Sequence, residues 1–272
     1  MLVDSHLHVW RSSQDYPEPA ATAVSSYSDV PLELLRQYMD EYSIDRAILV
    51  QPVYPGEDNS FVADCAASDS DRLAAVCVVD PSNPNAPDKL EYWASERGCK
   101  GLRLRPRIMG EDTTFGDPTT YRLWERASAL NLVVSLLASP EHLSMTALLA
   151  ERFPDVDIVI DHMAHPDVES GVSAPDFRAL LHLARYPRVF VKISGYYYFS
   201  KVGYPYADCW DFVRALYDQF GSRRLMWGSD FPHVLLQLGY RRCLMLQQRL
   251  YPFLSEADLD RIMGVNAADL YW

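Results

Sequence analysis

The sequence predicts a (β/α)8 barrel that occupies residues 1–272 as one domain. Eight short runs of β-branched and apolar residues each precede a longer stretch with helical spacing. Some runs, such as Leu73–Val79, are apolar throughout without alternation, which is typical of parallel strands covered on both faces. A length of 272 residues suits one barrel, and no linker or shift in composition divides the chain.

The predicted strands and helices follow one another along the whole chain. Pro31, Pro118, Pro140 and Pro175 stand where first helical turns begin, a position at which the N–H that proline lacks is not needed. An open doubly wound sheet is the weaker alternative, because its Gly-rich first turn is missing. The predicted strands are Leu2–Leu7, Arg46–Gln51, Leu73–Val79, Cys99–Leu104, Leu132–Leu137, Asp157–Asp161, Val189–Ser194 and Arg224–Ser229, and the predicted helices are Pro31–Tyr42, Asp58–Ser68, Asn85–Arg97, Pro118–Leu130, Pro140–Phe153, Pro175–Tyr186, Tyr206–Phe220 and Val234–Leu250.

Two further segments complete the prediction. The polar stretch Trp10–Val30, which contains proline and serine, is expected to form the first loop over the barrel mouth. A final helix is expected over Glu256–Met263, because Ser255 can cap it and Asp258 stands three residues on, close to a capping-box pattern.

Composition and charge exclude several classes of function. The formal net charge of −12 opposes nonspecific binding to nucleic acid or anionic membranes, although clustered arginines can still reverse the potential locally. With no signal-peptide pattern and no long apolar run, the sequence predicts a cytoplasmic protein. Its five cysteines form no CxxC pair and are expected to be reduced and structural. Serine-hydrolase, dinucleotide and P-loop motifs are missing.

Ionisable residues gather at the carboxyl ends of the predicted strands, where a barrel builds its active site. His6 and His8 are two residues apart, so in an extended segment both imidazoles point the same way and can hold one metal ion, water or carbonyl oxygen. His142 and His182 fall in predicted helices and are interpreted as structural. The other residues at these ends are Asp161, His162 and His165 after the sixth strand, and Asp230 and His233 after the eighth.

Cationic and aromatic residues at other strand ends indicate an anionic substrate. Arg103, Arg105 and Arg107 alternate, so an extended strand can present all three on one face, and arginine suits bidentate binding of a carboxylate. Arg103 is the firmest of these contacts, whereas ion pairing is the alternative for Arg105 and Arg107. The segment Tyr196–Phe199 can supply an aromatic wall and phenolic donors. The placement of Lys192, toward the site or toward the outer layer, stays open.

Several of these motifs together resemble those of the amidohydrolase superfamily, and most closely its amidohydrolase-related lactonases, which include 2-pyrone-4,6-dicarboxylate lactonase and sugar-lactone hydrolases. The resemblance spans nearly the whole chain and implies a barrel hydrolase. The motifs are Asp4-Ser5-His6-Leu7-His8-Val9-Trp10, Cys99-Lys100-Gly101-Leu102-Arg103, Val159-Ile160-Asp161-His162-Met163, Val191-Lys192-Ile193-Ser194-Gly195, Trp227-Gly228-Ser229-Asp230-Phe231-Pro232-His233 and Asn266-Ala267-Ala268.

The metal content implied by this resemblance is one ion or none. Many metal-dependent members have a further histidine after strand 5 or a bridging Lys or Glu at strand 4, and neither is present here, so a two-metal site is not expected. His6, His8 and Asp230 can hold one divalent ion such as zinc, with His162 nearby. No metal is equally compatible, because the branch includes members that hydrolyse without one.

The sequence therefore predicts a hydrolase that opens a small anionic lactone. We assign Asp230 as the general base, and His6, His8 and His162 as groups that polarise the carbonyl directly or through a metal. The predicted substrate contacts are Arg103, Arg105, His165, Tyr196 and His233. A metal-dependent nonoxidative decarboxylase of an aromatic or muconate-like acid is the alternative, followed by an inactive barrel that serves as a binding protein. The sequence also leaves a homodimer open.

Overall fold

Eight parallel strands form the barrel that the sequence predicts. The structure, a computed structural model, describes residues 1–11, 29–52, 57–105, 115–249 and 252–272. The strands pair in chain order without reversal, which confirms the barrel and excludes the doubly wound sheet. A parallel bridge between Leu7 and Phe231 joins the first strand to the segment after the last. The strands are β1 (Val3–Leu7), β2 (Arg46–Val50), β3 (Leu73–Val78), β4 (Gly101–Leu104), β5 (Val133–Leu136), β6 (Ile158–Ile160), β7 (Val189–Ile193) and β8 (Leu225–Trp227).

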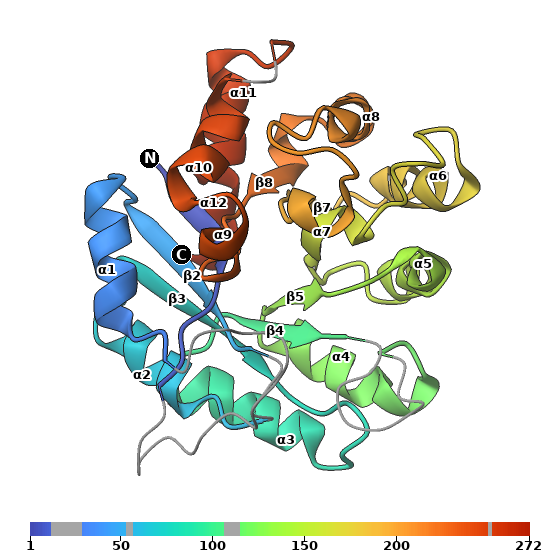
Figure 1. The fold of residues 1–272 in the computed structure, drawn as a ribbon. Helices are drawn as coiled ribbons and strands as arrows, with labels where there is room; N and C mark the ends of the chain where they lie inside the picture. Colours follow the sequence, from blue (N-terminus) through green and yellow to red (C-terminus); the bar gives the residue numbers. More distant parts are fainter. Residues whose placement is uncertain (12–28, 53–56, 106–114, 250–251) are drawn as a thin grey trace.

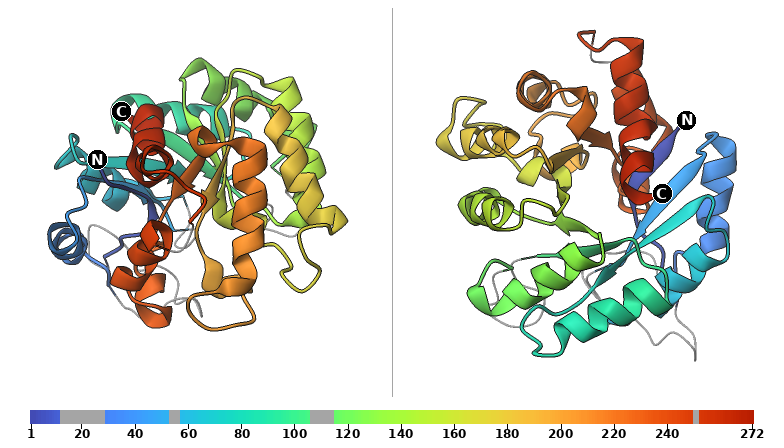
Figure 2. Two further views of the ribbon diagram at one scale, coloured as in Figure 1. Left: turned by 90° about the horizontal axis from the view of Figure 1, so that it is seen from above. Right: turned by 180° about the vertical axis from the view of Figure 1, so that it is seen from behind.

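Helices surround the strands as an outer ring, which the chain follows once around from the N-terminus to the C-terminus (Figure 1). The views from above and behind show the same arrangement, with the strands inside and the helices outside (Figure 2). The main helices are α1 (Leu32–Glu41), α2 (Ser60–Ala67), α3 (Ala86–Glu91), α4 (Tyr121–Ala129), α5 (Leu143–Arg152), α6 (Pro175–His182), α8 (Trp210–Phe220) and α10 (Tyr240–Arg249).

Burial on both faces explains the continuous apolar strands. Every residue of β3 is buried, because its side chains alternate between the barrel interior and the layer beneath the helices. The interior is apolar at one level, where Val3, Ile48 and Met226 pack with Tyr271 of α12 (Asn266–Tyr271). At the carboxyl ends of the strands the buried residues are instead polar. These are His6, His8, Arg103, Asp161, His162, Lys192 and Asp230.

The C-terminal third departs most from the prediction. The expected helix Val234–Leu250 is divided into α9 (His233–Gln237) and α10, because Gly239 adopts a left-handed backbone with φ of +81°. The final helix does begin at Ser255 with the predicted capping box to Asp258. It continues past Met263 as α11 (Glu256–Asp260), a π-helical turn over Arg261–Val265, and α12.

The predicted mouth loop is described only at its two ends. Trp10 and Val30 form an antiparallel bridge, with N–O distances of 2.9 and 2.8 Å. Residues 12–28, which make up most of the predicted loop, lie outside the described residues, as does Arg107.

Candidate active site

A bulge in β1 aims His6 and His8 into the barrel mouth. The pairing of β1 with β2 shifts register between Asp4 and Leu7. Strict alternation from Val3, which lies in the interior, would also turn Leu7 inward, but Leu7 packs beneath the outer helices. Bulges re-aim side chains in this way and often lie beside active sites. The two imidazoles are 5.0 Å apart between ring centroids.

Asp230 follows β8 and faces both of these histidines. Its backbone is left-handed, with φ of +59°, and its N–H donates to the His6 carbonyl at 2.8 Å. The Oδ1 atom lies 3.7 Å from His6 Nε2 and 3.3 Å from His8 Nε2. With only 1% of its surface exposed, the carboxylate is held inside the cluster.

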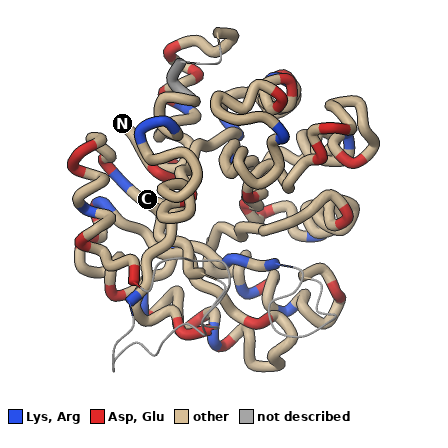
Figure 3. Tube along the Cα trace, viewed as in Figure 1, with Lys and Arg blue, Asp and Glu red and all other residues tan. Residues whose placement is uncertain are grey.

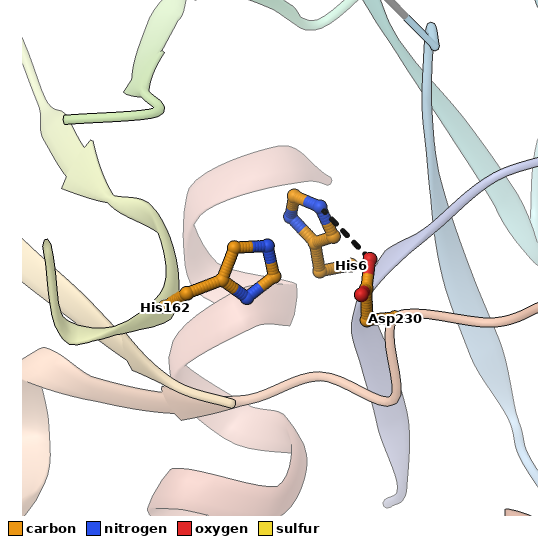
Figure 4. A group of neighbouring side chains, drawn as sticks. All are labelled: His6, His162 and Asp230. Carbon is orange, nitrogen blue, oxygen red and sulfur yellow. Dashed lines mark ion pairs between the residues drawn. The ribbon is translucent and has the colours of Figure 1, made fainter. Parts of the chain in front are cut away.

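His162 is placed by an unusual left-handed turn after β6. The segment Asp161–Ala164 continues into His165, and residues 162–165 all have φ between 50° and 56°. This conformation costs roughly 1–2 kcal/mol for each residue other than glycine. The His162 Nδ1 atom lies 2.9 Å from Ser194 Oγ. His6, His162 and Asp230 therefore point toward one another from three separate segments (Figure 4).

Beneath these groups lies a buried charge cluster centred on Asp161. Its Oδ2 atom accepts a hydrogen bond from Arg103 Nε at 3.1 Å, and its Oδ1 atom lies 3.1 Å from Lys192 Nζ. The Lys192 Nζ atom is also 3.0 Å from His6 Nδ1. Arg103 is 5% exposed, and the other three are fully buried. Lys192 thus faces the interior, which settles the placement that the sequence left open.

Burial and charge set opposite protonation states in this cluster. Burial lowers the pKa of His162 to about 3 and that of His6 well below its usual value, so both are neutral at pH 7. Burial alone would raise the pKa of Asp230, but its contacts with His8, His162 and His6 outweigh this effect and hold that pKa well below the usual range. An ionised carboxylate among neutral imidazoles is suited to accept a proton.

These shifts predict that the protein loses stability in mild acid. Because the pKa of His162 falls from 6.5 to about 3 on folding, the unfolded chain binds more protons than the folded one between those values, and the free energy of unfolding falls as the pH falls. Asp161 and Asp230, whose folded pKa values are depressed, add to this loss only below about pH 4. Urea unfolding at pH 7.5, 6.5 and 5.5 measures the slope, which His162→Gln should reduce. An unchanged slope in this variant would contradict the burial of a neutral His162.

The donor atoms fit one divalent cation. Two groups share Asp230: His6 and His162 complete one, and His8 and His233 complete the other, with each group's ligand atoms within 4.8 Å of one another. The predicted set of His6, His8 and Asp230 is divided between them. His8 Nδ1 lies 2.8 Å from the Val50 carbonyl oxygen, so its N–H donates there and Nε2 keeps its lone pair. A histidine held by its second nitrogen in this way is typical of metal ligands.

The residues predicted as substrate contacts lie at different depths. Two partly buried histidines border the cluster: His165 has its ring centroid 5.5 Å from that of His162, and His233 lies 5.6 Å from His8. Arg103 is paired with Asp161, as described above, and Arg105 is half-buried. Tyr196 is 2% exposed and stacks on Tyr206. Their roles toward substrate stay predictions.

The phenols that do contact the base come from the next two residues. Tyr197 and Tyr198 each donate a hydrogen bond of 2.6 Å to Asp230 Oδ2. They belong to the short helix α7 (Tyr196–Phe199), which begins after Gly195 with φ of +70°. The sequence shows the tyrosine cluster. Which of its members face Asp230 depends on the turn at Gly195, which was not predicted.

Gly228 is expected to be essential for the position of His6. A Cβ atom at this residue would lie 2.7 Å from His6 Cβ and 3.0 Å from its backbone nitrogen. Gly228→Ala should therefore displace β1 and cost about 1–3 kcal/mol of stability, and it should lower activity as well. Gly203→Ala is the matched control, because no atom of the described segments lies within 4 Å of its added Cβ. Thermal unfolding of both variants tests this, and equal midpoints would contradict the close contact.

Comparison with known proteins identifies the family. A family model described as amidohydrolase matches residues 3–272. The chain belongs to the amidohydrolase family. It is 32% identical over 234 residues to L-fucono-1,5-lactonase of Burkholderia ambifaria, with 85% of this chain and 80% of that protein covered. It is 30% identical over 238 residues to 4-sulfomuconolactone hydrolase of Hydrogenophaga intermedia, with 85% and 74% covered.

Solved structures of other proteins show the same barrel. An amidohydrolase from Burkholderia multivorans with bound zinc has a TM-score of 0.83 at 25% identity, covering 100% of this chain and 99% of that one. The 2,6-dihydroxybenzoate decarboxylase from Rhizobium has a TM-score of 0.71 at 14% identity, covering 99% and 98%, a likeness that shows the fold alone. The predicted resemblance to the lactonase branch is confirmed, and a hydrolase acting on a lactone fits the relatives better than a decarboxylase does.

Charged residues lie mostly on the outer helices of this amidohydrolase, with both signs interspersed (Figure 3). Within the described ranges, no helix combines the length and apolar character that crossing a membrane requires.

Proposed function

We propose that this amidohydrolase opens a small anionic lactone by general-base hydrolysis, within one domain formed by residues 1–272. The observation that carries this proposal is the pairing of a buried, ionised Asp230 with a buried His6 Nε2 that has no hydrogen-bond partner among the described residues. Burying such a nitrogen costs free energy unless another group forms a hydrogen bond with it. The carbonyl oxygen of a bound lactone is suited to that position.

In the proposed reaction, a water molecule beside Asp230 Oδ1 attacks the lactone carbonyl carbon. Asp230 takes one proton from this water as the new C–O bond forms, and the carbonyl oxygen becomes an oxyanion. Hydrogen bonds from His6 and His162 stabilise this charge. The ring C–O bond then breaks, and the proton held by Asp230 passes to the leaving oxygen. One water is consumed and one hydroxy acid is formed.

The two phenols are proposed to orient the base. Because Tyr197 and Tyr198 both donate to Oδ2, they leave Oδ1 facing His6 and His8. A carboxylate held in this way presents one defined oxygen to the attacking water. His8, whose Nε2 lies 3.3 Å from the same Oδ1 and keeps its lone pair, would polarise the carbonyl through a bound metal ion rather than by donating a hydrogen bond.

A single divalent ion such as zinc is compatible with this site, although the proposal does not require one. The ligands would be Asp230 with His8 and His233, or Asp230 with His6 and His162. When bound, such an ion polarises a carbonyl and makes water more acidic.

An anionic substrate is supported by the cations near the mouth. Arg103 supplies a permanent positive charge within the barrel, and Arg105 follows β4. His165 and His233 offer neutral donors at the edge of the cluster, and Tyr196 retains its predicted place among the contacts. The relative named for 4-sulfomuconolactone acts on an anionic lactone. We propose the same class of substrate here, without a commitment to ring size.

A panel of substrates separates this function from its alternatives. The purified protein is assayed against neutral and anionic lactones and against carboxylated aromatic acids, before and after dialysis against a strong chelator. We expect ring opening, with anionic lactones preferred. Release of CO₂ that chelation abolishes would instead establish the decarboxylase. No turnover of either class would favour a binding protein.

A further inference from the structure

Lys192 contacts Nδ1 of His6, the ring nitrogen on the side away from Asp230. It lies in β7, is fully buried, and places Nζ 3.0 Å from His6 Nδ1 and 3.1 Å from Asp161 Oδ1. An ammonium group has three donors and no acceptor. In the ion pair with Asp161, Lys192 can therefore only donate to His6, and Nδ1 must be the accepting nitrogen.

This direction of donation determines what His6 presents to the substrate. A neutral imidazole carries one proton, so when Nδ1 accepts, Nε2 carries the N–H. The Nε2 atom is buried and lacks a hydrogen-bond partner in the part of the chain that the structure describes. It lies 3.7 Å from Asp230 Oδ1, the ion pair that the dashed line in Figure 4 marks. The N–H is thus aimed into the space beside the base, where the oxyanion of the proposed reaction forms.

His8 has the opposite arrangement. Its Nδ1–H donates to the Val50 carbonyl at 2.8 Å, which leaves a lone pair on Nε2. Two histidines only two residues apart thus offer different chemistry to the same volume. His6 offers a proton donor, whereas His8 offers a nitrogen able to bind a metal.

We propose that Lys192 is a positioning residue that fixes His6 as a hydrogen-bond donor and withholds it from metal coordination. An ion at this site is then held through the group formed by His8, Asp230 and His233. The catalytic consequence rests on the proposed function, because it assigns the Nε2–H of His6 to the lactone carbonyl. The tautomer itself does not depend on the substrate.

Removal of Lys192 would favour a competing arrangement, in which His6 carries its proton on Nδ1. Asp161 Oδ1 lies 3.3 Å from His6 Nδ1 and could accept an N–H from it. Lys192 Nζ, which forms an ion pair with the same Oδ1 at 3.1 Å, donates to His6 Nδ1 instead, and Arg103 donates to Oδ2 at 3.1 Å. Without the lysine, Nδ1–H is free to donate to Asp161, and the Nε2 lone pair becomes a metal ligand.

Nitrogen NMR of the intact protein reads the tautomers directly. In protein labelled with ¹⁵N at histidine, long-range ¹H–¹⁵N spectra distinguish the protonated from the unprotonated ring nitrogen, and His6→Gln and His8→Gln assign the signals. We expect the proton on Nε2 of His6 and on Nδ1 of His8. A proton on Nδ1 of His6 in the unaltered protein would overturn the proposal.

Zinc affinity supplies a second readout, measured by competition with a chromophoric chelator. We expect Lys192→Met to bind Zn²⁺ at least about tenfold more tightly, because it gains an imidazole ligand. Adding His6→Ala should abolish that gain. Arg103→Met is the matched control, since it removes a cation from the same Asp161 without touching His6, and any gain it shows should survive the loss of His6.

A gain in Lys192→Met that persists without His6, or no gain at all, would overturn the proposal. If Lys192→Met does not fold, the spectrum of the unaltered protein decides alone. Neither readout uses turnover. A failed lactone assay therefore leaves the tautomer result standing, and a wrong tautomer leaves the lactone assay standing.

Discussion

Replacement of Asp230 by asparagine is expected to lower kcat for lactone hydrolysis by about 10²–10⁴-fold, the usual contribution of a general base. The amide cannot accept a proton from the attacking water. Its oxygen can still accept hydrogen bonds from Tyr197 and Tyr198, which now reach Oδ2 at 2.6 Å each. The side-chain volume is also unchanged, so the barrel should remain folded. Initial rates of ring opening, with thermal unfolding measured in parallel, test both statements.

The matched control is Asp157→Asn. Asp157 precedes β6 at the opposite end of the strand and pairs with Arg188 at 3.0 Å, far from the histidine cluster. We expect its kcat to stay near that of the unaltered protein. If Asp230→Asn turned over lactone as fast as this control, Asp230 would not be the base.

The largest effect on stability is expected from Asp161→Ala. The substitution leaves Arg103 and Lys192, at 5% and 0% exposure, without their shared carboxylate. Removing one partner of a buried ion pair costs about 3–5 kcal/mol because the remaining charge is uncompensated, and here two charges remain. Urea unfolding, monitored by two independent probes to check that the transition is two-state, measures the loss.

An exposed ion pair provides the contrast. Asp218 pairs with Arg214 at 2.9 Å on the surface of α8, and both side chains are about half exposed. Asp218→Ala should cost at most about 0.5 kcal/mol. If both aspartate variants lost the same stability, Asp161 would not act as the counter-charge of the barrel interior.

The strands could be predicted from the sequence because buried parallel strands have a simple signature. All eight observed strands fall inside their predicted ranges, since continuous apolar runs such as that of β3 fit no exposed element. That His6, His8, His162 and Asp230 lie close together could also be predicted, because each stands at or just after the carboxyl end of a strand and these ends meet at one face of the barrel.

Local backbone geometry could not be predicted in the same way. The bulge that turns His6 inward leaves no mark in the residue pattern. The left-handed turn that places His162 and His165 runs against the intrinsic preference of every residue in it. Tertiary packing decides such features, so the selection of Tyr197 and Tyr198 over Tyr196, and the interior placement of Lys192, emerge only from the fold.

Isotope labelling tests most directly the claim that Asp230 activates water for attack on a lactone. The protein is given excess substrate in H₂¹⁸O, and mass spectrometry then measures ¹⁸O in the product and in the peptide that contains Asp230. We expect label in the carboxylate of the hydroxy acid and none in Asp230. Label in the side chain of Asp230 would show that this carboxylate attacks the carbonyl itself and would contradict its assignment as the general base.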